Sequence, residues 1–121
     1  MSVPVWIAIG LLGGVGAVLR FFIDGSIASG VGRDFPVGTF VVNLSGSAIL
    51  GLLVGIGLSG DRLLLAGTAT IGSYTTFSTW MLESQRLVED GEPAVAARNV
   101  LLSLGIGLGA AALGRFIGAH L

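Results

Sequence analysis

The sequence predicts an all-α membrane protein of four transmembrane helices, on three observations: few charges, four long charge-free stretches and abundant glycine. The chain has 121 residues, of which 53% are hydrophobic and 11% are charged, whereas soluble domains carry about 25% charged residues. Its formal net charge is −1, so there is no basic surplus to hold nucleic acid. We therefore expect a single transmembrane domain over residues 1–121, in contact with membrane lipid and with no nucleic-acid partner.

The charge-free stretches set the bounds of the expected helices. A helix needs about 20 residues to cross a hydrocarbon core about 30 Å thick. The stretches are bounded by charged residues such as Arg20, Asp61 and Glu83. They predict helices near residues 3–23, 37–59, 63–88 and 94–118, with a linker over 24–36 and tight turns at 60–62 and 89–93.

Glycine makes up 21 of the 121 residues, or about 17%, whereas its usual share of a chain is about 7%. Small residues four positions apart let membrane helices approach closely. Three of the expected helices contain such pairs, namely Gly10 and Gly14, Gly51 and Gly55, and Gly105 and Gly109. Tight helix packing explains most of these glycines.

An even number of spans places both termini on one side of the membrane, so the arginines can be sorted between the two faces. The terminal face receives Arg62 and Arg115, and the opposite face receives Arg20, Arg33, Arg86 and Arg98. The two faces differ by only two arginines, which is a weak signal for orientation under the rule that cytoplasmic loops are enriched in arginine and lysine. It permits insertion in both orientations and hence an antiparallel dimer.

The third stretch is rich in hydroxyl groups, with seven Ser or Thr residues in TATIGSYTTFSTW at positions 68–80. Such hydroxyls often bond back to their own helix. However, Gly72 is followed by Ser73, Thr75 and Thr76, which are poor helix formers, and irregular backbone at membrane depth survives only inside protein or along a water-filled cavity. The pattern favours a broken third helix, whose released carbonyls suit a small hard cation.

Polar residues also line one side of two other expected helices. Thr39, Asn43 and Ser47 follow one another at four-residue spacing, and Asn99 and Ser103 repeat the pattern in the fourth helix. Each stripe is either a contact between helices or a polar lining. The amide of Asn43 has two hydrogens that an anion would accept.

Two aromatic residues, Phe77 and Trp80, accompany these stripes, and no charged residue lies in the central part of any expected span. Amides, hydroxyls and the positive edges of aromatic rings together replace an anion's hydration without a fixed cation that would trap it. Arg20, near a helix end, either attracts anions to a vestibule or anchors the helix at the interface. The combination favours a channel for a small anion.

Three segments resemble the Fluc, or CrcB, family of fluoride channels. They are GGVGAVLR at 13–20, PVGTFVVNLSGS at 36–47 and GSYTTFSTWMLE at 72–83, in order along essentially the whole chain. The resemblance implies a dual-topology antiparallel homodimer in the inner (plasma) membrane. It further implies two pores that export fluoride passively from the cytoplasm, and no enzymatic activity.

The resemblance also implies roles for single residues. The anion pathway would include Arg20, Asn43, Thr76, Phe77, Thr79, Trp80 and Ser103. A structural Na⁺ at the dimer centre would be held by the main-chain carbonyls of Gly72 and Thr75. Two departures affect the pathway: Trp80 replaces the usual Phe, and Asn99 and Gly107 stand where some members carry Tyr and Ser.

Two other functions compete with an anion channel. Small multidrug transporters also have four helices and assemble antiparallel, but they need a carboxylate in the first helix, and residues 1–19 contain none. A membrane-assembly subunit would need only the glycines for packing. The seven hydroxyl residues of the third stretch argue against that second function.

Overall fold

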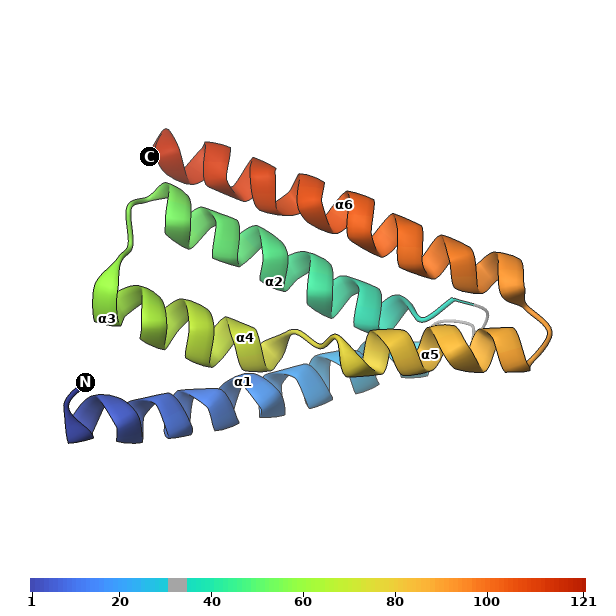
Figure 1. Cartoon of the computed structure of the whole chain (residues 1–121), viewed down its shortest axis with the longest axis horizontal. Coiled ribbons are helices and arrows are strands. Elements are labelled where there is room, and N and C mark those ends of the chain that lie inside the picture. Colours follow the sequence, from blue (N-terminus) through green and yellow to red (C-terminus); the bar gives the residue numbers. More distant parts are fainter. Residues whose placement is uncertain (31–34) are drawn as a thin grey trace.

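The computed structural model describes residues 1–30 and 35–121 (Figure 1). Arg33, one of the arginines sorted between the two membrane faces above, lies outside these residues. The described residues contain helices and no strand, which confirms the all-helical fold class. The elements are α1 (Val3–Gly30), α2 (Val37–Gly55), α3 (Gly60–Leu63), the π-helix η1 (Leu64–Ile71), α4 (Gly72–Tyr74), α5 (Ser78–Glu89) and α6 (Pro93–Ala119). Within the described ranges, α1, α2 and α6 are long and apolar enough to cross a membrane.

The helices run side by side along one long axis, and both termini lie at the same end (Figure 1). The short helices from α3 to α5 follow one another along a single line. Helix α2 packs mainly on α6, η1 and α4 pack on α1, and α5 packs on α6. This arrangement places the hydroxyl-rich segment between α1 on one side and α2 and α6 on the other.

The first helix continues past the expected end at residue 23 and reaches Gly30. Asp24 therefore lies within α1 instead of opening a linker. A charged residue marks the edge of the apolar slab, but it does not end a helix whose backbone stays hydrogen-bonded beyond that edge. The carboxylate of Asp24 lies against Gly38 of α2, where a β-carbon would collide with it.

The turn after α2 lies earlier than the sequence predicts, over residues 56–59 instead of 60–62, and α3 occupies the predicted turn. Gly57 has a left-handed backbone with φ +87°. Its N–H donates to the carbonyl of Val54, and the N–H of Leu58 donates to the carbonyl of Leu53, both at 3.1 Å. These two bonds form a Schellman motif, which ends α2 at Gly55.

The turn between α5 and α6 lies where the sequence predicts it and uses the same motif. Gly91 has φ +78° and donates to the carbonyl of Val88, while Glu92 donates to the carbonyl of Leu87. Pro93 then occupies the first position of α6, where its missing N–H leaves no bond unmade.

Glycine allows close packing of α2 and α6, but at only some of the predicted positions. A β-carbon on Gly51 would collide with the backbone of Ala111, and one on Gly114 would collide with that of Ala48. Gly55 lies equally close to the backbone of α6. By contrast, no described atom of another helix lies within 4 Å of a β-carbon built on Gly10, Gly14, Gly105 or Gly109. The spacing rule finds small residues, but it does not say which neighbour their face meets.

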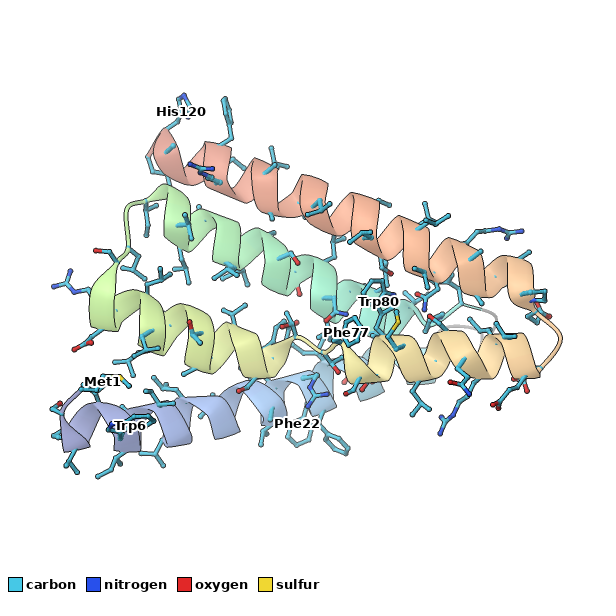
Figure 2. The ribbon with its side chains drawn as sticks, viewed as in Figure 1. Met1, Trp6, Phe22, Phe77, Trp80 and His120 are labelled. Atoms are coloured by element: carbon cyan, nitrogen blue, oxygen red, sulfur yellow. The ribbon has the colours of Figure 1, made fainter. Side chains whose placement is uncertain are left out.

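Large apolar side chains cover the outer faces of the bundle. Trp6 and Phe22 on α1 are examples, both more than half exposed, and Figure 2 shows Phe22 on the side of α1 away from the other helices. Apolar side chains in such positions suit contact with lipid tails or with another apolar surface.

Candidate functional site

A groove of about 450 Å³ runs between α2, the η1–α4 segment, α5 and α6. Its walls combine aliphatic residues with a polar and aromatic set. This set consists of Asn43, Ser47, Thr68, Thr75, Thr76, Phe77, Trp80 and Ser103. Gly72 and Gly107 lie on the same walls, and no charged residue of the described chain lines the groove. Five of the seven predicted pathway residues therefore meet in one place.

The backbone is not helical between α4 and α5. Helix α4 ends at Tyr74, Thr75 is extended with φ −80° and ψ 163°, and α5 begins at Ser78. The side-chain amide of Asn43 serves the interrupted backbone: its Oδ1 accepts from the N–H of Thr76, and its Nδ2 donates to the carbonyl of Thr76, both at 2.8 Å. One side chain of α2 thus satisfies both polar groups of a non-helical residue, which would otherwise be expensive to bury.

The interruption removes the helical donors of the carbonyls of Gly72 and Thr75, the two that the family resemblance implies as cation ligands, although the carbonyl of Gly72 still accepts from the hydroxyl of Thr75 at 3.4 Å. In a continuous helix, the N–H of Thr76 would donate to Gly72 and the N–H of Thr79 would donate to Thr75. Instead, the first N–H donates to Asn43 and the second donates to the hydroxyl of Thr76 at 3.2 Å. The described residues contain no group of three or more His, Cys, Asp or Glu side chains.

Phe77 and Trp80 lie beside the interruption, with their rings in contact (Figure 2). The ring centroids are 5.8 Å apart, and the planes meet at 83°, so an edge of one ring faces the other. Phe77 is 70% exposed in the single chain, whereas the indole N–H of Trp80 donates to the carbonyl of Asn99 at 3.2 Å.

The remaining two predicted residues, Arg20 and Thr79, line a second cavity of about 20 Å³, together with Asp24, Thr39, Val42 and Thr76. Because Thr76 lines both spaces, the two cavities are neighbours. The Nε of Arg20 is buried and has no hydrogen-bond partner in the described chain. The lining of this cavity therefore combines a guanidinium group, a carboxylate and three threonine hydroxyl groups.

Sequence reasoning missed several contacts around this site. Thr39 donates to the carboxylate of Glu83, which links α2 to α5. Ser84 accepts a hydrogen bond from the Nδ2 of Asn99 at 2.8 Å, so Asn99 joins helices instead of lining the groove. The sequence places Ser84 one helical turn after Trp80, which marks it as a neighbour of that residue. Only the fold shows that its other partner is Asn99, across the α5–α6 turn.

Comparison with known proteins places this chain in a family. Residues 7–115 match the family described as CrcB-like protein, Camphor Resistance (CrcB). The chain belongs to the CrcB family. The resemblance that the three motifs indicate is thereby confirmed, and the chain is a multi-pass membrane protein.

Several curated relatives of this CrcB chain bear the name fluoride-specific ion channel. FluC 2 of Mycobacterium tuberculosis is 51% identical over 117 residues, which cover 97% of this chain and 93% of the relative. FluC 2 of Mycolicibacterium paratuberculosis is 54% identical over 114 residues, covering 94% and 93%. FluC 1 of Symbiobacterium thermophilum is 40% identical over 119 residues, covering 93% and 96%.

Proposed function

We propose that this chain is a fluoride-selective ion channel, and that its role is conduction and not an enzymatic reaction. The observation that carries the proposal is the groove in which Asn43 and the Phe77–Trp80 pair meet, with no charged residue of the described ranges 1–30 and 35–121 in its walls. The names of relatives at 51% and 54% identity support fluoride as the permeant ion.

The chemistry of the walls suits a small anion that sheds part of its water. One hydrogen of the Asn43 Nδ2 is committed to Thr76, but an amide nitrogen carries two. The second hydrogen, the ring edges of Phe77 and Trp80 and the hydroxyl of Thr76 are groups that would face fluoride. The hydroxyl of Ser103 would join them by turning its hydrogen away from the Oδ1 of Asn99, to which it donates at 3.4 Å. Arg20 and Thr79 would act earlier, where the second cavity collects anions from the vestibule.

We infer an antiparallel, dual-topology homodimer with two pores. The segment from α3 to α5 would form the interrupted third span of four, in agreement with termini at one end of the bundle (Figure 1). The groove is open along one side in the single chain, and Phe77 on its wall is 70% exposed. A second copy would cover that side. The dimer would lie in the plasma membrane and release fluoride from the cytoplasm down its gradient.

A structural Na⁺ at the dimer axis fits the same geometry. The carbonyls of Gly72 and Thr75 have lost their helical donors, and oxygen ligands without charge suit a hard monovalent ion. Two carbonyls from each protomer would supply about four oxygens around one ion on a two-fold axis. Bound there, Na⁺ would join the two interrupted segments without entering the anion pathway.

The direct test is efflux from liposomes that contain the purified protein, loaded with either fluoride or chloride and given only a concentration gradient. Fluoride should leave rapidly through protein-containing vesicles and not through empty ones, while chloride is retained. Equal release of both anions would contradict selectivity, and retention of both would contradict conduction.

A further inference from the structure

A small hydrogen-bond network lies behind Trp80, between α5 and α6. The Nδ2 of Asn99 donates to the hydroxyl of Ser84 at 2.8 Å, and this hydroxyl donates to the carbonyl of Trp80 at 2.9 Å. The indole N–H of Trp80 then donates to the carbonyl of Asn99 at 3.2 Å, which closes the loop. The hydroxyl of Ser103 joins at the edge, 3.4 Å from the Oδ1 of Asn99.

The network connects two residues of the groove through two residues that lie outside its walls. Trp80 and Ser103 line the groove, whereas Ser84 and Asn99 do not. Asn99 is only 1% exposed and Ser84 is 7% exposed. Both polar ends of the Asn99 side chain are engaged, so its burial satisfies the requirement that a buried amide be hydrogen-bonded.

Tryptophan has a specific need at this position. A phenylalanine ring has no polar atom, but a buried indole N–H requires an acceptor. The acceptor here is the main chain of α6, which lies within reach only while α5 and α6 are held at their present separation. The Asn99–Ser84 bond crosses the same gap one helical turn further along α5.

From this geometry we propose that Asn99 is a positioning residue for the anion pathway. It holds α5 against α6, so that the ring of Trp80 and the hydroxyl of Ser103 keep their orientation on the groove wall. The proposal rests on the proposed channel function, since it assigns a role within that pathway. Asn99 itself would not touch the anion.

The test uses two variants that break the same bond from opposite ends and one matched control. Asn99→Leu keeps the branching of the side chain at Cγ without polar atoms, and Ser84→Ala removes a single oxygen. Ser45→Ala is the control: it removes the 2.9 Å hydroxyl contact with Tyr74 between α2 and α4, and neither residue lines the groove. Each variant is made with and without Trp6→Phe, which leaves Trp80 as the only tryptophan.

Two readouts separate positioning from general destabilisation. The first is fluoride efflux from liposomes, and the second is the fluorescence anisotropy of Trp80 in the full-length protein. We expect Asn99→Leu and Ser84→Ala to lower fluoride efflux by about fivefold to tenfold, in line with loss of one buried hydrogen bond. Both should also lower the anisotropy, because the indole gains freedom. Ser45→Ala should change neither quantity by as much as twofold.

The proposal is overturned if both bond-breaking variants keep the efflux and the anisotropy of the wild-type protein. It is also overturned if Ser45→Ala loses as much efflux as they do. If Asn99→Leu does not fold, Ser84→Ala decides through the same two readouts. A wild-type protein without fluoride efflux would contradict the channel function instead. In that case the anisotropy alone decides whether Asn99 positions Trp80.

Discussion

The side-chain amide of Asn43 pairs with both backbone polar groups of Thr76, each at 2.8 Å, and so links α2 to the non-helical segment between α4 and α5. This gives the amide a structural task as well as its proposed task in the pathway. The two tasks are compatible because the Nδ2 carries a second hydrogen. Asn43 would therefore set the shape of the interruption and face the anion from the same position.

Replacing Asn43 by Asp tests both tasks. The substitution keeps the size of the side chain, but a carboxylate oxygen would then face the carbonyl oxygen of Thr76, and a negative charge would enter the anion pathway. We expect fluoride efflux from liposomes to fall below detection while the variant still elutes at the same volume as the unmodified protein in size-exclusion chromatography. Ser45→Ala on the same helix is the control. Normal efflux through Asn43→Asp would leave Asn43 with its structural task only.

Phe77 tests the contribution of the ring edges. Phe77→Ile keeps an apolar side chain but removes the polarised ring, which is in edge contact with Trp80. Fluoride efflux should fall by more than about tenfold, which corresponds to a rise of roughly 1.4 kcal/mol or more in the free-energy barrier to permeation. Phe22→Ile on the outer face of α1 is the matched control and should conduct normally. Equal efflux from the two variants would show that the ring at position 77 only packs.

The sequence predicts where the long helices lie better than it predicts which residues meet between helices. Charge-free stretches locate the long helices because the apolar slab has a fixed thickness. The break near Gly72 is recognisable because Gly, Ser and Thr gather there, although α4 keeps residues 72–74 helical and the interruption falls at Thr75. The bond from Asn43 to Thr76 and the network around Asn99 were not predictable, because both are long-range contacts between stripes that looked equally suited to lining or packing.

The proposed cation should depend on the interruption more than on any side chain. Gly72→Ala fits sterically, since the nearest atom to a new β-carbon is the carbonyl oxygen of Gly67 at 3.9 Å. Gly72→Ala should nevertheless change the Na⁺ dependence little, because Gly72 is already helical in α4. The interruption falls at Thr75, where Thr75→Ala favours a continuous helix by about 0.6 kcal/mol, so this variant should raise the Na⁺ concentration for half-maximal thermal stabilisation about threefold. Thr75→Ser should leave it nearly unchanged. A melting temperature that does not differ between Na⁺ and a large organic cation would remove Na⁺ from the account.

Dual topology predicts that both orientations occur in one membrane. A tag placed at either terminus should be accessible to a membrane-impermeant reagent from each side, in comparable fractions, because the arginines are only weakly biased between the two faces. Adding two arginines to the C-terminus should shift the fractions toward one orientation and reduce the yield of active dimer. A single orientation in every unmodified molecule would exclude the antiparallel dimer.

The central claim, selective conduction of fluoride, is tested most directly by the reversal potential of the purified protein in a planar bilayer. The two chambers hold equal chloride and a tenfold difference in fluoride, balanced with an impermeant anion. A channel selective for fluoride should reverse at about 59 mV in magnitude, the value for a tenfold gradient of a monovalent ion, with the sign set by the fluoride gradient. A reversal potential at zero, where the equal chloride concentrations place it, would contradict the account.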